Sequence, residues 1–385
     1  MKKLLVVLLA ISLIFAFAAC GNDTPADNGN TENVDGALTV DTIKIGHVHI
    51  NDEAEQGYST AHINAINQMA AALGIPAENV IGKYNVTEDA ACESALRELA
   101  EAGCNIIFAD SFGFEDYVIE VAKDYPNIQF CHATGVQAST CGLDNVSNYF
   151  GKIFQARYLS GIVAGMATES NILGYVSAQE FAECVSGYTG FYLGAKSVNP
   201  DVTMNVIYTN NWYDVTAETQ AAQALIASGA DVLGQHADST ATQAACEADG
   251  NAYGIGYNTD MSAAAPNANL CSVVWDWTPA YTYFVECLLN GEDCPSDWSG
   301  DLASGMVDIV YNDAAMATLA NCDEIKAAVE AARTAIVNGE LNVFAGPLVD
   351  VDGNEVVAEG DFYNESGESS APSWFYVLQG INVIR

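Results

Sequence analysis

From Thr42 onward, short runs of β-branched and apolar residues alternate with longer alanine-rich segments whose apolar positions recur every three or four residues. The short runs predict β-strands and the longer segments predict amphipathic helices. Strands are expected at residues 42–50, 79–86, 106–109, 128–134, 173–178, 204–209, 232–236, 253–257 and 272–275. Helices are expected at residues 58–73, 88–102, 115–124, 150–168, 182–197, 216–228, 240–249 and 279–289.

Strands that alternate with helices of this length predict an α/β fold with parallel sheets covered by helices on both faces. The alternation runs twice, and the long helix at residues 150–168 lies near its middle. This favours two doubly wound parallel-sheet lobes joined by a hinge. The predicted N-terminal lobe is 41–148 plus about 276–312, and the predicted C-terminal lobe is 149–275 plus about 313–385.

The first twenty residues have the pattern of an export signal. Lys2 and Lys3 precede an apolar run at residues 4–17, which is too short for a stable membrane-spanning helix. Ala18-Ala19-Cys20 resembles a bacterial lipobox, so residues 1–19 are expected to be removed and Cys20 to be lipidated. An ordinary secretory cleavage that leaves Cys20 as a thiol is the alternative. The polar residues that follow, up to about residue 40, predict a flexible tether.

The chain carries 50 Asp and Glu residues against 12 Lys and Arg, with a formal net charge of −38. A surface of this sign repels phosphate backbones and anionic lipid headgroups, so a nucleic-acid partner is not expected. A neutral or cationic small molecule fits this charge better than a phosphorylated one. The expected location is the extracytoplasmic face of the cell membrane, with the chain held by its lipid anchor.

Apart from Cys20, ten cysteines are spread along the chain. An even number in an exported protein is compatible with disulfides, and the nearest pairs in sequence are Cys131 with Cys141 and Cys287 with Cys294. Buried free thiols are an equally good interpretation. The cysteines are too scattered for a zinc motif, and no metal or cofactor is expected.

Motifs of catalysis and metal binding are absent or weak. The sequence has no nucleophile elbow, Walker-type loop or HExxH motif, which argues against an enzyme. His47, His49, His62 and His236 suit hydrogen bonding or packing better than zinc ligation. Residues 350–355 partly match a calcium loop but place Glu355 where that loop needs glycine, so a β-hairpin turn is favoured.

Aromatic and polar residues follow several of the predicted strands. Ligands of doubly wound sheets bind beyond the carboxyl ends of the strands, so these residues are the candidates for a binding site. They are Asp52, Tyr58, Ser111, Phe112, Trp212, Asp214, Asp238, Asp260 and Trp275. The aromatic side chains suit stacking on a flat ring, and the carboxylates suit orientation by hydrogen bonds. Helix capping by the aspartates and packing between lobes by the aromatics are the competing interpretations.

Several of these residues lie in sequence blocks that resemble the basic membrane lipoprotein family, the substrate-binding lipoproteins of ABC importers that include purine-nucleoside receptors. The resemblance covers about residues 44–310 plus the Gly346-Pro347 hairpin. Its blocks are Gly57-Tyr58-Ser59 with His62, Ser111-Phe112-Gly113-Phe114, Arg157-Tyr158-Leu159 with Gly161 and Ala164-Gly165, Trp212 with Asp214, and Gly256 to Met261.

The resemblance implies a type I periplasmic-binding-protein-like fold and roles for individual residues. Tyr58 and Trp212 resemble the aromatics that enclose the purine, Asp52 lies in the ligand-binding first turn, and Asp260 resembles the carboxylate that holds ribose hydroxyls. Nucleoside-binding members usually place a lysine shortly after the Ser-Val-Val segment, where this chain has Trp275. This departure puts ribose recognition in doubt and makes a free nucleobase or another flat heterocycle a serious option.

The sequence as a whole predicts a lipid-anchored substrate-binding protein that captures a flat, neutral heterocycle, a purine nucleoside or nucleobase, for an ABC permease and its ATPase. A sensory lipoprotein that signals ligand binding to a membrane partner is the main alternative. An exported hydrolase is a weaker one, because no catalytic constellation is recognisable.

Overall fold

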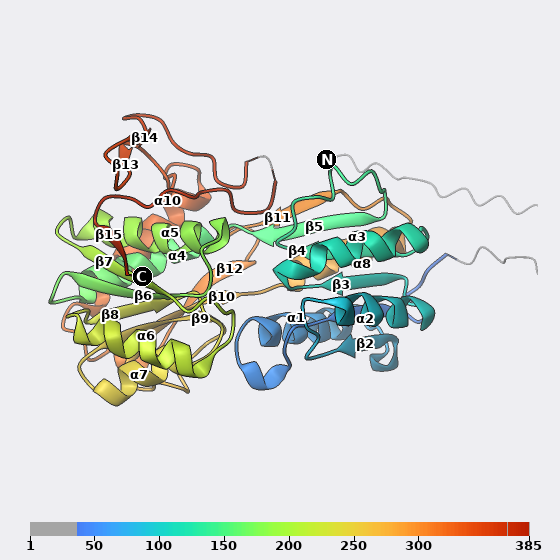
Figure 1. The fold of residues 1–385 in the computed structure, drawn as a ribbon, viewed down its shortest axis with the longest axis horizontal. Helices are drawn as coiled ribbons and strands as arrows, with labels where there is room; N and C mark the ends of the chain where they lie inside the picture. Colours follow the sequence, from blue (N-terminus) through green and yellow to red (C-terminus); the bar gives the residue numbers. More distant parts are fainter. Residues whose placement is uncertain (1–36, 368, 385) are drawn as a thin grey trace, which may run out of the picture. The chain divides into compact units, whose positions relative to one another are not determined.

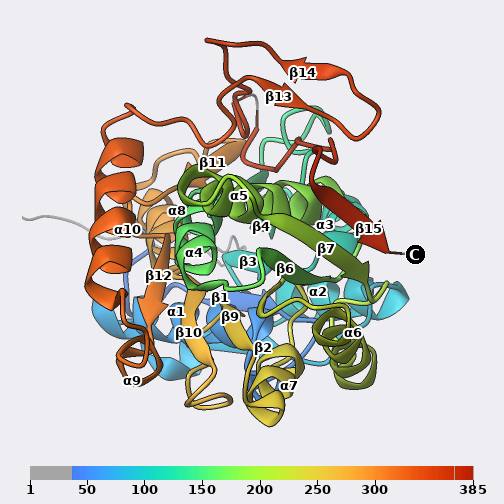
Figure 2. The same cartoon turned by 90° about the vertical axis from the view of Figure 1, so that its left-hand side faces the viewer.

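Two sheets with helices packed on both faces form the fold in a computed structural model, which describes residues 37–367 and 369–384 (Figures 1 and 2). The predicted export signal, the lipidation site Cys20 and the tether up to residue 36 lie outside the described residues. Residues 37–385 cluster into one compact unit. In the described part of the chain, no helix is both long enough and apolar enough to span a bilayer.

The first sheet has the strand order β11-β5-β4-β3-β1-β2, and all its neighbouring strands are parallel. Its strands are β1 (Ile45–Val48), β2 (Val80–Lys83), β3 (Ile106–Ala109), β4 (Gln129–Ala133), β5 (Val146–Gly151) and β11 (Asp297–Gly300). Helices α1 (Tyr58–Leu73) and α8 (Thr278–Asn290) pack together on one face, and α2 (Ala90–Glu101) and α3 (Glu115–Asp124) on the other. Burial on both faces explains the continuous apolar run of β3.

The second sheet has the strand order β12-β10-β9-β8-β6-β7-β15. Its strands are β6 (Ile172–Ser177), β7 (Thr203–Tyr208), β8 (Val232–Gln235), β9 (Tyr253–Asn258), β10 (Asn269–Trp275), β12 (Val307–Tyr311) and β15 (Ile381–Ile384). Within the described sheet, β12 pairs with β10 in the antiparallel sense and the other neighbours are parallel. Helices α6 (Val215–Ala227) and α7 (Ala241–Asp249) pack together on one face.

The other face of the second sheet carries α4 (Ile153–Ala167), α5 (Ala182–Val198) and α10 (Cys322–Val337). Helices α4 and α5 approach so closely that a Cβ at Gly161 would lie 2.0 Å from the Phe191 carbonyl oxygen. Glycine is therefore required there. The short elements are η1 (Glu53–Glu55), η2 (Ala77–Asn79), η3 (Phe112–Phe114), α9 (Asp313–Met316), and the hairpin of β13 (Leu348–Val349) and β14 (Glu355–Val357).

The predicted α/β fold with parallel-sheet lobes is confirmed. Each predicted strand range overlaps an observed strand, and each predicted helix range overlaps an observed helix. The pattern missed β5, in which Ser147, Asn148 and Gly151 interrupt the apolar run. The predicted helix at residues 150–168 begins three residues later, because Phe150 and Gly151 belong to β5. β12 lies in the second sheet, although its residues fall in the segment assigned to the N-terminal lobe. The ten cysteines among the described residues are free thiols.

Candidate ligand-binding site

A cavity lies where the carboxyl ends of strands from both sheets face each other. It encloses about 350 Å³ of empty space, part of it open to solvent. From the first sheet side it is lined by Ile50, Tyr58, Asp110, Ser111, Phe112 and Thr134, and from the second by Glu183, Trp212, His236, Asp238 and Tyr257. This is the position at which parallel α/β sheets bind their ligands.

Aromatic rings from both sheet sides surround the cavity. Phe112, which is 44% exposed, stacks on Phe181 with ring centroids 5.0 Å apart, and Phe181 contacts Trp212 at 6.1 Å. Phe112 follows β3 of the first sheet, whereas Phe181 and Trp212 belong to the second. The cluster therefore bridges the two sides. Deeper in the cavity, the buried hydroxyl of Tyr58 has no hydrogen-bond partner among the described residues.

Three carboxyl groups, those of Asp110, Glu183 and Asp238, also line the cavity. Burial raises the pKa of Glu183 to about 7. Burial likewise raises the pKa of Asp238 well above its ordinary value, and the nearby carboxyl of Glu55 adds to this, while a hydrogen bond of 2.8 Å from Asn258 Nδ2 opposes it. Burial thus favours the protonated form of Glu183 and Asp238, in which a carboxyl group both donates and accepts hydrogen bonds.

Among the side chains that the structure describes, no lysine or arginine lines this cavity. Arg157 of α4 lies behind the lining, where its guanidinium carbon is 3.6 Å from the centroid of the Tyr257 ring. Its Nη1 donates a 2.6 Å hydrogen bond to the carbonyl oxygen of Gln235. The positive charge of Arg157 partly offsets the burial of Glu183, and it also lowers the pKa of His236, which burial already holds well below its ordinary value. The site thus suits a ligand with N–H or O–H donors and disfavours an anion.

The two sides of the cavity touch through the turn that precedes α1. Thr259 Oγ1 donates a 2.6 Å hydrogen bond to the carbonyl oxygen of Gln56. A Cβ placed on Gly57 would lie 2.1 Å from the carbonyl oxygen of Asp238. The backbone of the first side is therefore in direct contact with the second, which is the closed arrangement of the cavity.

Five of the nine predicted binding residues line the cavity together: Tyr58, Ser111, Phe112, Trp212 and Asp238. Three further predicted residues lie outside the lining, and each accepts hydrogen bonds from backbone N–H groups of the turn or helix that follows it. Asp52 and Asp214 cap η1 and α6 through backbone N–H groups two or three residues on, and Asp260 accepts from the N–H of Ser262. In this arrangement, local turn and helix chemistry occupies these three carboxylates.

Trp275 is also outside the lining, but it supports a residue that belongs to it. Its indole stacks on Trp277 with ring centroids 4.4 Å apart, and its Nε1 donates to the Tyr257 hydroxyl at 3.3 Å. Trp275 therefore packs behind the wall to which Tyr257 contributes.

Sequence reasoning missed several lining residues. Asp110, His236 and Tyr257 lie at or beside strand ends, so their position in the sequence could have indicated them as candidate binding residues. Glu183 lies in the first turn of α5 and had no such signal. Only the packing of α5 against the cavity places it there.

The histidines are distributed over both sides of the site. His47 and His49 contact each other, whereas His236 belongs to the second sheet and lies near Glu183. Across residues 37–367 and 369–384, no three His, Cys, Asp or Glu side chains are grouped as metal ligands. Residues 350–354 form a turn of the β13–β14 hairpin, in which Asp350 accepts from the N–H groups of Asp352 and Asn354.

Two parallel-sheet lobes with a cavity at their facing strand ends define the class of type I periplasmic solute-binding proteins. Solved structures agree on the fold. A solute-binding protein of an ABC transporter system from Aeropyrum pernix aligns with a TM-score of 0.67 and 18% identity, over 80% of this chain and 95% of that one. One from Conexibacter woesei aligns with a TM-score of 0.63 and 21% identity, over 78% and 98%.

The family model of PnrA-like ABC transporter substrate-binding proteins matches residues 45–343, and the chain belongs to this family. The resemblance seen in the sequence is thereby confirmed, and the family binds solutes and is not enzymatic. A purine-binding protein of Brucella abortus is 35% identical over 321 residues, 83% of this chain and 88% of that protein. A putative ABC transporter glucose-binding protein of Haloferax volcanii is 32% identical over 364 residues, 92% and 88%.

Proposed function

We propose that this substrate-binding protein captures a flat, neutral nitrogen heterocycle, a purine nucleobase or nucleoside, and delivers it to an ABC permease and its ATPase. In this proposal the chain is held at the extracytoplasmic face of the membrane by a lipid on Cys20. The ligand lies in the cavity between the two sheets, and the lobes close on it about their connecting segments.

The observation that carries the proposal is the combination of aromatic rings and buried carboxyl groups around one cavity. Tyr58, Phe112 and Trp212 offer ring faces for stacking. Asp110, Glu183 and Asp238 offer hydrogen-bond acceptors for the N–H groups of a heterocycle. Ring faces supply affinity for a flat ligand, and acceptors at its edge supply orientation. The purine-binding relative from Brucella abortus supports the same ligand class.

The cavity favours a nucleobase over a nucleoside. Asp260, which the family resemblance associates with ribose, caps a turn outside the lining. Trp275, which stands near the position of the family's usual lysine, packs behind Tyr257. The lysine usual in nucleoside-binding members is therefore absent and Asp260 lies outside the lining, whereas aromatic rings suited to the base line the cavity.

The experiment is thermal unfolding of the purified protein with adenine, hypoxanthine, xanthine, adenosine, inosine, guanosine, riboflavin and glucose. At about one hundred times its dissociation constant, a ligand adds roughly 2.7 kcal/mol to the free energy of unfolding, enough to raise Tm by several degrees. A Tm shift with the bases alone supports the nucleobase proposal. A Tm shift with nucleosides as well would mean that the cavity also accommodates ribose. A shift with glucose and none with any purine would refute the purine proposal and assign the cavity to a sugar.

A further inference from the structure

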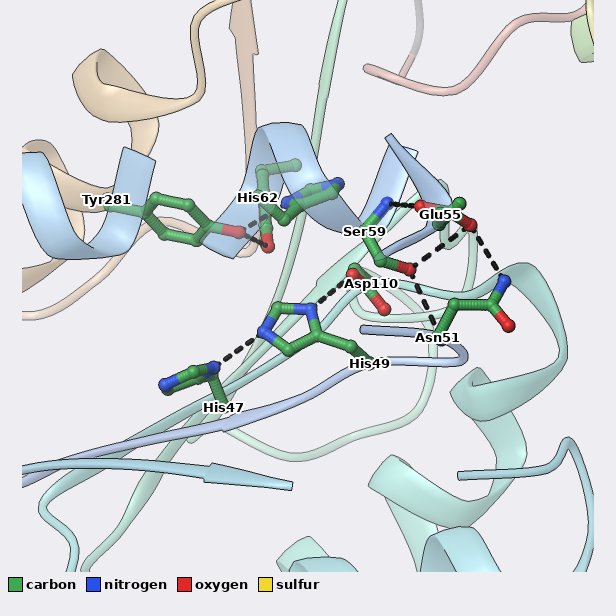
Figure 3. A network of polar contacts seen from close by, with 9 residues as sticks. His47, His49, Asn51, Glu55, Ser59, His62, Asp110 and Tyr281 are labelled. Atoms are coloured by element: carbon green, nitrogen blue, oxygen red, sulfur yellow. Dashed lines mark hydrogen bonds and ion pairs between the residues drawn. The ribbon is translucent and has the colours of Figure 1, made fainter. Parts of the chain in front are cut away.

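A chain of three buried side chains leads from β1 of the first sheet to the cavity (Figure 3). His47 Nδ1 lies 2.5 Å from His49 Nε2, and His49 Nδ1 lies 2.5 Å from Asp110 Oδ2. The three residues are 2%, 1% and 2% exposed. His47 and His49 project from the same face of β1 and its extension, and Asp110 directly follows β3, the neighbouring strand. Asp110 alone of the three lines the cavity.

The two oxygens of the Asp110 carboxyl have different surroundings. Oδ2 is held by His49, whereas Oδ1 is buried and has no hydrogen-bond partner among the described residues. A buried carboxylate oxygen without a partner is costly, because it has lost water and gained nothing in exchange. Such an oxygen at a cavity wall is a position for a donor that a ligand brings.

The two contacts are consistent with one assignment of protons along the chain. In this assignment His49 Nδ1 carries the proton and donates to Asp110 Oδ2. In neutral His49, Nε2 is then an acceptor and receives the N–H of His47 Nδ1. With Oδ2 occupied by His49, the unpartnered Oδ1 is the oxygen that can accept a hydrogen bond at the cavity.

The surface end of the chain is covered by Tyr84. Its ring centroid is 5.7 Å from the ring centroids of both His47 and His49, and the Tyr84 ring stacks on that of His49. Burial lowers the pKa of His47 well below its ordinary value, and the neighbouring His49 contributes to this. His47 therefore stays neutral at pH 7 and keeps its role as the donor to His49.

We propose that His49, itself oriented by His47, is a positioning residue that fixes Asp110 so that Oδ1 accepts a hydrogen bond from an N–H group of the ligand. This inference rests on the proposed function of the cavity and adds a requirement to it, because the bound heterocycle must offer an N–H donor at the Asp110 edge. His49 acts through Asp110 and does not line the cavity.

The first test compares adenine binding by the wild type, His49→Leu and His49→Asn in titration calorimetry. Leucine removes the donor to Oδ2, whereas the side-chain amide of asparagine places an N–H close to the position of the imidazole Nδ1. We expect Kd to rise about ten- to a hundredfold in His49→Leu, the range for one hydrogen bond to a charged group. His49→Asn restores Kd to within about threefold of the wild type. Equal affinity in all three proteins would overturn the inference.

The donor requirement is tested on the ligand side with 9-methyladenine and 6-dimethylaminopurine, each of which lacks N–H groups that adenine has. At least one of them should bind the wild type about tenfold or more weaker than adenine, and this discrimination should shrink in His49→Leu. If both analogues bind as tightly as adenine, no N–H donor is needed and the inference fails. The proposal that the cavity binds a purine would be unaffected by that result.

A measurement without ligand separates this inference from the proposed function. In the protein labelled with ¹⁵N-histidine, His49 should give a far-downfield proton bound to Nδ1, and the signal should be lost in Asp110→Leu and in His49→Leu. Absence of that resonance in the wild type refutes the His49–Asp110 link whatever the ligand is. Its presence in a protein that binds no purine supports the link and refutes only the purine assignment.

Discussion

Gly57 occupies a position where one added methyl group opposes the closed arrangement of the two lobes. A Cβ there would lie 2.1 Å from the carbonyl oxygen of Asp238, 3.0 Å from its carbonyl carbon and 3.4 Å from its Cα. All three are backbone atoms of the opposite side, so no side-chain rotation relieves the contact.

The magnitude follows from the displacement that alanine requires. Ordinary contact begins near 3.4 Å, so the Asp238 oxygen must recede by about 1.3 Å. Overpacking of this kind costs about 1 to 3 kcal/mol. This cost is absent in an open form of the protein, so it opposes only the closure of the lobes around the ligand. The Kd of Gly57→Ala should therefore be roughly 5 to 150 times higher than that of the wild type. The lost preference for glycine at the start of α1 adds only a small destabilisation.

The assay is calorimetric titration of Gly57→Ala with the ligand identified by thermal unfolding, next to Asn64→Ala as the matched control. Asn64 lies on the exposed side of the same helix, so its replacement adds nothing between the lobes. Asn64→Ala should bind like the wild type. A Gly57→Ala protein that folds normally and binds within twofold of the wild type would show that ligand is not held with Gly57 packed against Asp238, and would refute the reasoning.

Three further predictions concern single side chains. Trp212→Ala should raise Kd roughly 5- to 150-fold, since stacking of a base on one aromatic ring is worth about 1 to 3 kcal/mol, and Tm should stay nearly unchanged; unchanged affinity by titration would remove Trp212 from the site. Asp214→Ala should lose the α6 cap, worth about 1 kcal/mol, and lower Tm by about one to two degrees in calorimetry without altering Kd, and Asp214→Asn should recover it. Burial raises the pKa of Glu55 and of Glu183 to about 7 from 4.5, so both favour the folded state when protonated. The lowered pKa values of the buried His47 and His236 act in the opposite sense over the same range, so the test is the difference between the wild type and Glu55→Gln. The free energy of unfolding of the wild type, measured with denaturant, should fall relative to that of Glu55→Gln as pH rises from about 5 to about 7; a relative rise would contradict the burial argument.

The sequence pattern was most informative where burial is two-sided and regular. The bounds of α1, α3 and β3 agree with those expected from apolar periodicity, because each ends at a change to polar or turn-forming residues. The pattern failed for β5 and β12, in which polar side chains interrupt the apolar run. β12 also reverses direction against β10, and no local signal distinguishes that pairing from a return to the first sheet.

The aromatic part of the site was accessible from sequence, whereas Glu183 was not. Tyr58, Phe112 and Trp212 follow strands, and an aromatic ring in such a turn has few structural uses. Glu183 is one of many acidic residues in the first turn of a helix, a common and stabilising position. Its burial in the cavity depends on how α5 packs, which is a property of the assembled fold.

The aspartates at strand ends show why residue type alone does not identify a binding group. Asp52 and Asp214 are followed directly by helical turns whose free N–H groups they accept. Asp238 also precedes a helix, but Ser239 accepts the N–H of Ala241 in its place. Asp238 is thereby left free to face the cavity. Asp-Ser also occurs at Asp110 and Ser111, the other strand end that contributes a carboxyl group to the site, but there Glu88 takes the place of the cap. Its Oε1 accepts from the N–H of Gly113 and from the hydroxyl of Ser111, so Asp110 is likewise not needed for capping.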